Sequence, residues 1–321
     1  MEVQNTVHPL ITQRADPYVY KHTDGYYYFT ASVPAYDAIE LRRSRTLPGL
    51  SQAKPVTIWT RHNAGPMSKH IWAPELHWID GRWYLYFAAG EMEDQWRIRP
   101  FVLGCQGPDP LTDAWTELGI MQAADEDPYS FTDFSLDATV FDHGGNYYFV
   151  WAEKVGGEKG ISNLYIAQME SPVKLRTVQV LLSTPDYDWE RVGFWVNEGP
   201  AVLKRNGRIY LAYSASATGA CYCMGLLSAD ADGDLLDPRT WSKARCPVLR
   251  TDEELGVFGP GHNSFTVSES GEDVVVFHAR PYERIEGNPL YDPNRHAYWM
   301  KLLWNKEGMP EFQNSLRTIF P

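Results

Sequence analysis

Five segments of the chain each begin with an ionisable residue, continue with apolar and aromatic residues, and end in a tight turn that contains glycine. The ionisable residues are Asp16, Glu75, Asp137, Glu198 and His262. Four carboxylates gathered in a small space repel one another, so at least one is expected to hold its proton to a higher pH. Hydrolysis of a glycosidic bond needs a protonated carboxyl, an ionised carboxylate and aromatic faces on which a sugar ring can stack. The pattern predicts a carboxylate-centred site of this kind.

The turns that end these segments recur along the chain. Their glycines are Gly25, Gly81, Gly145, Gly207 and Gly271, which lie 56, 64, 62 and 64 residues apart. Each ionisable residue precedes its turn glycine by six to nine residues. Equivalent positions of repeated units that are arranged around an axis lie on one ring, so we expect the five ionisable residues to meet at one mouth of a central tunnel.

The repeat length also predicts the architecture. About 60 residues accommodate a four-stranded antiparallel sheet with its connections, and radial repetition of such sheets forms a propeller. A β-sandwich would show turns every 8 to 12 residues, without a longer period of the same turn chemistry. An aromatic content of 14%, with 25 Gly and 22 Pro, favours strands and turns over helices. We predict an all-β, five-bladed β-propeller, and because no linker interrupts the chain we expect residues 1–321 to form a single domain.

Charge and motifs exclude several classes of function. The net charge of −12 argues against a nucleic acid or an anionic membrane as partner, and a neutral oligosaccharide fits better. No Gly-x-Ser-x-Gly, phosphate-binding loop, dinucleotide fingerprint or His-Glu-x-x-His motif is present, which removes the common acyl, phosphoryl, hydride and metalloprotease chemistries.

The N-terminal residues and the cysteines indicate where in or outside the cell the protein is expected. The N-terminus lacks the basic and apolar regions of a signal peptide, and the four cysteines include no Cys-x-x-Cys pair, so we expect a cytoplasmic protein, or a secreted one if a signal was removed. The oligomeric state stays open.

Six short motifs, in this order, together resemble glycoside hydrolase family 43. They are Ala15-Asp16-Pro17-Tyr18, His70-Ile71-Trp72-Ala73-Pro74-Glu75, Ser135-Leu136-Asp137-Ala138-Thr139, Trp195-Val196-Asn197-Glu198-Gly199-Pro200, Gly259-Pro260-Gly261-His262-Asn263-Ser264 and Phe277-His278-Ala279-Arg280. The longer runs 191–200 and 291–296 resemble most closely the branch of exo-acting α-L-arabinofuranosidases that attack α-1,5-linked arabinan.

The resemblance implies a five-bladed propeller and an inverting mechanism carried by three acids. Asp16 would be the general base that activates water, Glu198 the general acid, and Asp137 the residue that holds the acid and tunes its pKa. The position of His262 resembles that of a histidine on the propeller axis, beside a calcium or sodium ion. No cofactor is implied for the chemistry itself.

The remaining candidates have two interpretations each. Trp72 and Trp195 adjoin acid-bearing positions, which favours contact with the sugar over packing between blades, whereas Trp78 and Trp83 are expected to be core. His262 could equally be a buried histidine without a metal.

The charged candidates are similarly divided. Glu75 either contacts the ligand or supports the pocket wall through an Arg or a His. Arg280 resembles a sugar contact, and Arg295 either binds hydroxyls or ties the C-terminal strand to the first blade.

Three alternatives to an exo-acting arabinofuranosidase stay open. A β-xylosidase or an endo-arabinanase would use the same fold with different loops. A carbohydrate-binding propeller without turnover would keep the stacking aromatics but would not need Asp16, Asp137 and Glu198 together.

Overall fold

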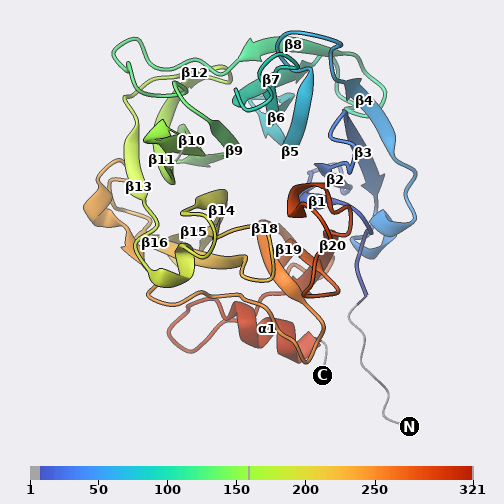
Figure 1. Cartoon of the computed structure of the whole chain (residues 1–321), viewed down its shortest axis with the longest axis vertical. Coiled ribbons are helices and arrows are strands. Elements are labelled where there is room, and N and C mark those ends of the chain that lie inside the picture. The colour runs from blue at the N-terminus through green and yellow to red at the C-terminus, as the bar shows by residue number, and fades with distance from the viewer. Residues whose placement is uncertain (1–7, 158–159, 320–321) are drawn as a thin grey trace.

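The computed structural model describes residues 8–157 and 160–319; residues 1–7, part of the N-terminus that led us to expect no signal peptide, lie outside them. Five antiparallel sheets follow one another around a central axis (Figure 1). The protein is therefore an all-β, five-bladed β-propeller, as the repeat predicted. Among the described residues, no helix is long and apolar enough to cross a membrane.

Each blade is built from consecutive strands. Blade 1 contains β1 (Ala15–Lys21), β2 (Tyr27–Ser32), β3 (Ala38–Ser44) and β4 (Val56–Thr60). Blade 2 contains β5 (Lys69–Ile79), β6 (Arg82–Gly90), β7 (Arg99–Cys105) and β8 (Trp115–Ile120). Blade 3 contains β9 (Ser135–His143), β10 (Asn146–Val155), β11 (Ile161–Ser171), β12 (Lys174–Leu175) and β13 (Val180–Ser183).

The last two blades complete the ring. Blade 4 contains β14 (Asn197–Arg205), β15 (Arg208–Ala215), β16 (Cys223–Asp230) and β17 (Ser242–Lys243), and blade 5 contains β18 (Phe258–Val267), β19 (Asp273–Arg280) and β20 (His296–Lys301). Short 3-10 helices span Pro48–Ser51, Asp188–Glu190, Pro238–Thr240 and Pro289–Tyr291. The α-helix α1 (Phe312–Ile319) lies outside the ring of sheets (Figure 1).

The five repeated turns join the first and second strands of the five blades. Their glycines all have positive φ, between 71° and 83°, a region that glycine enters without a Cβ clash. In blade 4, Asn206 and Gly207 form such a two-residue turn between β14 and β15. Glu198 therefore lies at the start of the first strand of its hairpin, as predicted.

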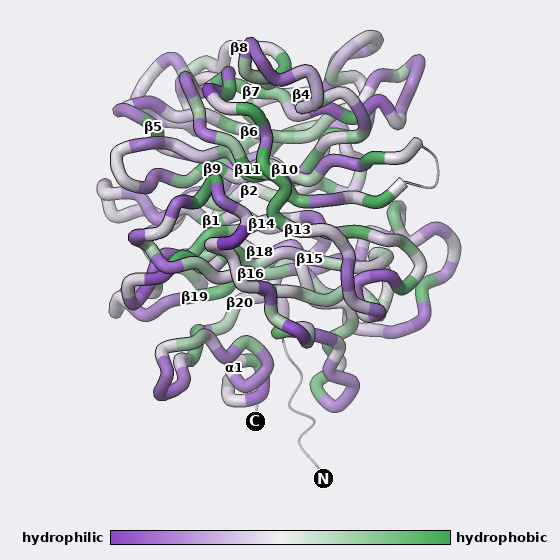
Figure 2. The backbone as a smooth tube through the Cα atoms, turned by 90° about the vertical axis from the view of Figure 1, so that its left-hand side faces the viewer, coloured by the Kyte–Doolittle hydropathy of each residue, from purple (hydrophilic) through white to green (hydrophobic). Residues whose placement is uncertain are grey.

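Apolar and aromatic side chains fill the space between neighbouring sheets. Trp83 is fully buried and packs against Tyr28 of blade 1, with ring centroids 5.1 Å apart, and against Trp78, at 4.8 Å. Both tryptophans belong to the core between blades, as expected. Figure 2 shows hydrophobic stretches concentrated in the strands and hydrophilic ones mainly in the outer turns and loops.

A segment before β1 closes the ring. The backbone of Ile11 exchanges two hydrogen bonds with Ala297 of β20, with N···O distances of 3.2 and 2.9 Å. The N-terminal segment thus lies beside the last strand of blade 5, and the first and last blades are joined by backbone pairing.

Candidate active site

Each innermost strand has a residue with the left-handed backbone conformation at an equivalent position near its start. These residues are Asp16, Ala73, Asp137, Gly199 and His262, with φ between 44° and 56°; His70 of β5 and Gly259 of β18 also have positive φ. At each of these positions the pairing with the second strand shifts its register, which marks a β-bulge. A bulge changes the direction in which a side chain points. Four of the five are not glycine, so the conformation costs energy that the surrounding structure must offset.

This ring corrects the register predicted from the sequence. In blade 2 the equivalent position is Ala73 rather than Glu75, and in blade 4 it is Gly199 rather than Glu198. A Cβ atom at Gly199 would lie 3.1 Å from Cγ of His262, so this close approach requires glycine. The predicted positions were obtained by counting residues back from the turn glycines. This count could not include the extra residues that the bulges add.

The structure nevertheless brings the three predicted catalytic acids together around His262. Nδ1 of His262 lies 3.3 Å from Oδ1 of Asp16 and 3.7 Å from Oδ2 of Asp137. The same Oδ2 accepts a hydrogen bond from the backbone N–H of Gly199, at 3.1 Å, so Asp137 touches the residue that follows Glu198.

Asp16 is buried and surrounded by donors. The hydroxyl of Ser32 donates to its Oδ2 at 2.5 Å, and Nη1 of Arg295 lies 3.3 Å from Oδ1. Burial alone would raise the pKa of Asp16, but the positive charge of Arg295, the largest opposing cause, holds the pKa well below its ordinary range.

Arg295 is the permanent positive charge in this group. Nδ1 of His278 accepts the backbone N–H of Asp16 at 3.0 Å, which requires an unprotonated nitrogen. Burial lowers the pKa of His278 to about 3 and also lowers that of His262, so both rings are neutral near pH 7. The ionised form of Asp16 therefore depends mainly on Arg295.

The pKa of Glu198 is shifted in the opposite direction from that of Asp16. Burial raises its pKa to about 7; the hydrogen bond from Tyr222 opposes the rise, and the charge of Asp16 supports it. The hydroxyl of Tyr222 donates to Oε1 of Glu198 at 2.9 Å. The apolar residues that precede Glu198 in the chain do not supply this burial, because Phe194 and Trp195 are 66% and 50% exposed. Their apolar surface points into solvent, and the buried Tyr222 meets the carboxyl instead.

Asp137 stays protonated to a higher pH than an ordinary aspartate. Burial raises its pKa well above the usual range, and the charges of Glu198, Asp16 and Glu75 raise it further. Asp137 and Glu198 form a close acidic pair that resists double ionisation, as expected for two neighbouring carboxyl groups.

Glu75 lies in the wall around these acids. Its Oε2 is 2.8 Å from Nε2 of His77, and Nδ1 of His77 is 3.4 Å from the hydroxyl of Tyr18. This contact is the supporting interaction with a histidine that the sequence left open. Contact of Glu75 with a ligand stays a prediction.

An aromatic group borders the site. Trp72 is buried and stacks on His70, with centroids 4.4 Å apart, and Tyr36 meets it edge-on at 5.8 Å. Trp96, which is 50% exposed, continues the group at 5.1 Å from His70. Trp195 is separate: the guanidinium of Arg191 lies 4.5 Å from its ring centroid. Sugar contact by Trp72 and Trp195 stays a prediction.

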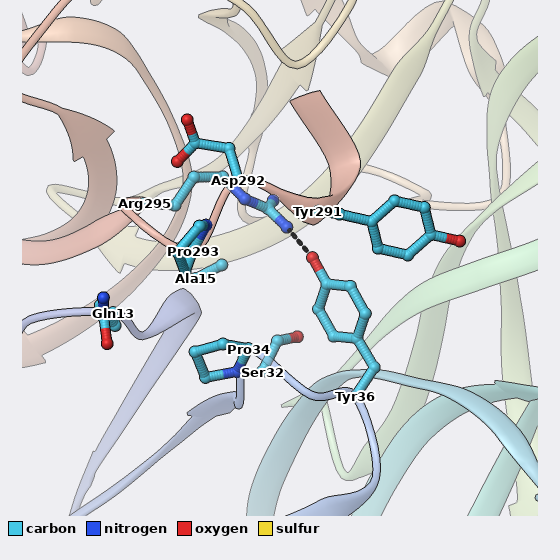
Figure 3. Close-up of a pocket in the computed structure, with 9 residues that line it drawn as sticks. All are labelled: Gln13, Ala15, Ser32, Pro34, Tyr36, Tyr291, Asp292, Pro293 and Arg295. Carbon is cyan, nitrogen blue, oxygen red and sulfur yellow. Dashed lines mark hydrogen bonds between the residues drawn. The ribbon is translucent and has the colours of Figure 1, made fainter. Parts of the chain in front are cut away.

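The two predicted arginines occupy different surroundings. Arg295 lines a small pocket formed by residues near β1 and by the segment before β20, and its Nη2 donates to the hydroxyl of Tyr36 at 2.8 Å (Figure 3). It therefore ties the segment before the last strand to blade 1, one of the two expected roles. Arg280 donates to the carbonyls of Thr218 and Pro289, both at 2.8 Å, so its terminal nitrogens hold loops. Sugar contact by Arg280 also stays a prediction.

The protein groups beside His262 provide too few ligands for a hard cation. Calcium takes six to eight oxygen ligands, whereas the groups found here are the ring nitrogen and one carboxylate oxygen each of Asp16 and Asp137. Within residues 8–157 and 160–319, no group of three His, Cys, Asp or Glu side chains can hold a metal ion.

Four residues of the site were missed in the sequence or given no role there. Tyr222 contacts Glu198, His278 and Ser32 contact Asp16, and Tyr36 contacts Arg295. The alternating run around Tyr222 could not reveal its role, because Tyr222 precedes β16 and does not lie in a strand.

The fold and this site define a propeller with acid–base machinery built from carboxyl groups. The model of the family described as "Glycosyl hydrolases family 43" matches residues 6–310. The chain belongs to this family.

Similar proteins support the assignment. The "Extracellular exo-alpha-(1->5)-L-arabinofuranosidase" of Streptomyces avermitilis is 51% identical over 305 residues, covering 95% of this chain and 62% of that protein. The protein of the same name from Streptomyces chartreusis is 54% identical, covering 88% and 84%. The crystal structure of an α-L-arabinofuranosidase from Lactobacillus brevis superposes with a TM-score of 0.90 at 52% identity, covering 97% of both chains. The chain thus spans less than two thirds of the Streptomyces avermitilis relative.

Proposed function

We propose that this protein is an inverting, exo-acting α-L-arabinofuranosidase that releases L-arabinose from α-1,5-linked arabino-oligosaccharides. The observation that carries the proposal is the opposite displacement of two carboxyl pKa values in one site: Asp16 is held ionised, and Glu198 keeps its proton up to a pH of about 7. Environments that push the pKa values of two acids apart separate the base from the acid. The identity of the sugar and the exo mode of attack are proposed from the names of the relatives.

In the proposed reaction, Asp16 accepts a proton from a water molecule as the water oxygen attacks the anomeric carbon. Glu198 gives its proton to the departing glycosidic oxygen, so the bond breaks without release of an unstable anion. One water is consumed, and attack from the face opposite the leaving group inverts the configuration. Proton exchange with solvent then restores both carboxyl groups.

Asp137 acts on Glu198 in this scheme rather than on the sugar. Its carboxyl accepts the N–H of Gly199, and ionisation of Asp137 and of Glu198 oppose each other. The pair therefore resists losing both protons, and Asp137 fixes the backbone beside the acid.

The remaining candidates are proposed to hold the substrate. Trp72 and Trp195 offer aromatic faces for a neutral sugar ring, and Glu75, Arg280 and Arg295 offer charged groups for hydroxyls. We keep a calcium or sodium ion beside His262 as an untested proposal in which water supplies most of the ligands.

The location also belongs among the proposals. A cytoplasmic protein was expected, but the names of both Streptomyces relatives include the word extracellular. We therefore propose a secreted protein, and comparison of its amount in culture medium and in cell extract tests this.

Product analysis decides between the candidate functions. Purified protein should convert linear α-1,5-arabino-oligosaccharides to arabinose, shortening each chain by one residue at a time. A ladder of oligomers would favour an endo-arabinanase, and xylose released from xylo-oligosaccharides a β-xylosidase. Sugar binding without any reducing sugar released would favour a binding propeller. If arabino-oligosaccharides and an aryl arabinofuranoside both stay intact, the proposal is wrong.

A further inference from the structure

Glu190 is a buried carboxylate beneath the loop that leads to the proposed acid. Its side chain is 0% exposed. Oε1 accepts hydrogen bonds from Nδ2 of Asn197 at 2.9 Å and from the hydroxyl of Tyr213 at 2.8 Å. Nζ of Lys243 lies 2.8 Å from Oε1 and 2.9 Å from Oε2.

The other side of the carboxylate holds the loop itself. Oε2 accepts the backbone N–H groups of Asp186 and Tyr187, at 2.7 and 2.9 Å. A buried charge is tolerated only when it is paired and its lone pairs are satisfied, and both conditions are met here. Because five donor groups converge on it, the carboxylate has one well-defined position.

Asn197 connects this fixed carboxylate to the acid. Its amide nitrogen donates to Glu190, and its amide oxygen accepts the hydroxyl of Ser183 at 2.7 Å, so both ends of the side chain are held. Asn197 is fully buried and immediately precedes Glu198. A rotation of the backbone at Asn197 would therefore move the carboxyl of Glu198.

The acid has less support of its own than the base has. Among the described residues, hydrogen bonds to the carboxylate of Asp16 come from Ser32 and Arg295, whereas the carboxyl of Glu198 receives one, from Tyr222. The direction of Glu198 must therefore be set largely by its backbone. A general acid donates efficiently only when its proton points at the leaving oxygen.

We propose that Glu190 is a positioning residue, which acts through Asn197 to orient Glu198 toward the leaving group. The inference rests on the proposed function. Glu190 acts by fixing the position of Asn197 rather than through its charge, because that charge is balanced by Lys243. Loss of Glu190 should therefore impair proton donation to the leaving group more than it impairs attack by water.

Leaving groups of different basicity test the proposal. An arabino-oligosaccharide needs a proton from the acid, whereas a 2,4-dinitrophenyl arabinofuranoside has a leaving group stable enough to depart without one. In Glu190→Gln an amide NH₂ faces donors that previously met a carboxylate oxygen, so the side chain cannot keep its position. We expect kcat for the oligosaccharide to fall at least ~10-fold more than kcat for the dinitrophenyl substrate, with KM changing little.

Two further variants keep the test decisive. Asn197→Ala breaks the same bridge but leaves the pair of Glu190 and Lys243 intact, so it decides the question if Glu190→Gln does not fold. Asp273→Asn is the matched control, because Asp273 is also a buried carboxylate paired with a cation, Arg205 at 3.2 Å, and lies at the opposite end of the strands from the site. The control should affect both substrates equally.

The outcomes separate the two proposals. Equal losses on both substrates in Glu190→Gln and Asn197→Ala, as in the control, would overturn the positioning role while leaving the arabinofuranosidase intact. A further loss in the double variant, equal to the product of the single losses, would also contradict a single connected bridge. Wild-type protein that turns over neither substrate would contradict the proposed function, and the inference with it.

Discussion

The guanidinium of Arg295 lies 3.3 Å from Oδ1 of Asp16, although the two residues are 279 positions apart in the chain. Both side chains are buried, and Arg295 also bonds Tyr36. The proposed base is therefore kept ionised by a residue that reaches it only after the propeller has closed.

Replacement of this arginine should change the pH dependence at the acidic end. In Arg295→Met the pKa of Asp16 should rise, because the opposite charge that holds it down is lost. Since the base works only when ionised, the acidic limb of the kcat/KM profile should move to higher pH. Arg205→Met, which removes a half-exposed cation on the opposite face, is the control, and equal profiles for the two variants would contradict the role of Arg295.

The wild-type profile should be bell-shaped. Glu198 must be protonated to act, and its pKa is raised to about 7, so activity should fall as the pH rises through that value. The pKa of Asp16 is lowered, so the acidic limb should lie below the ordinary aspartate range. A profile of kcat/KM between pH 3 and 9 measures both limbs. A basic limb near pH 4.5, the range of an unperturbed glutamate, would be inconsistent with Glu198 as the acid.

The two carboxylates should respond differently to removal. Glu198→Gln should lower kcat on arabino-oligosaccharides by at least ~10²-fold, with much of the loss absent for a dinitrophenyl leaving group. Asp16→Asn should lower kcat by a similar factor on both substrates, because every substrate needs the activated water. Circular dichroism checks that both variants are folded. Interchanged results would reverse the assignment of acid and base.

Removal of metal should have little effect. The described residues offer no set of ligands for an ion, and the two carboxyl groups carry the proposed chemistry alone. Dialysis against a chelator should therefore change kcat/KM by less than about twofold, a difference too small to represent a lost catalytic group. Loss of activity that calcium alone restores would show that an ion near His262 is required.

The sequence predicted the architecture because the blades repeat a local pattern. A glycine turn followed by an aromatic strand depends on neighbouring residues only, so Gly25 and its four equivalents could be recognised without tertiary information. The position of Glu75 was predicted wrongly because a bulge at Ala73 adds residues between the turn and the ring.

Contacts between blades were harder to predict. Tyr222 and Arg295 reach the acids from loops of irregular length, where no period indicates which side chain faces inward. Glu190 gave no signal either, since its partners come from four different segments and its burial follows only from the folded chain.

The stereochemistry of the first product tests the central claim most directly. Proton NMR spectra recorded in the first minutes of hydrolysis of an α-1,5-arabino-oligosaccharide show which anomer of arabinose appears before mutarotation. With Asp16 activating water and Glu198 protonating the leaving oxygen, the β-anomer should appear first and the α-anomer should follow as it equilibrates. Initial release of the α-anomer would mean retention of configuration through a covalent intermediate, and would contradict the roles proposed here for both carboxylates.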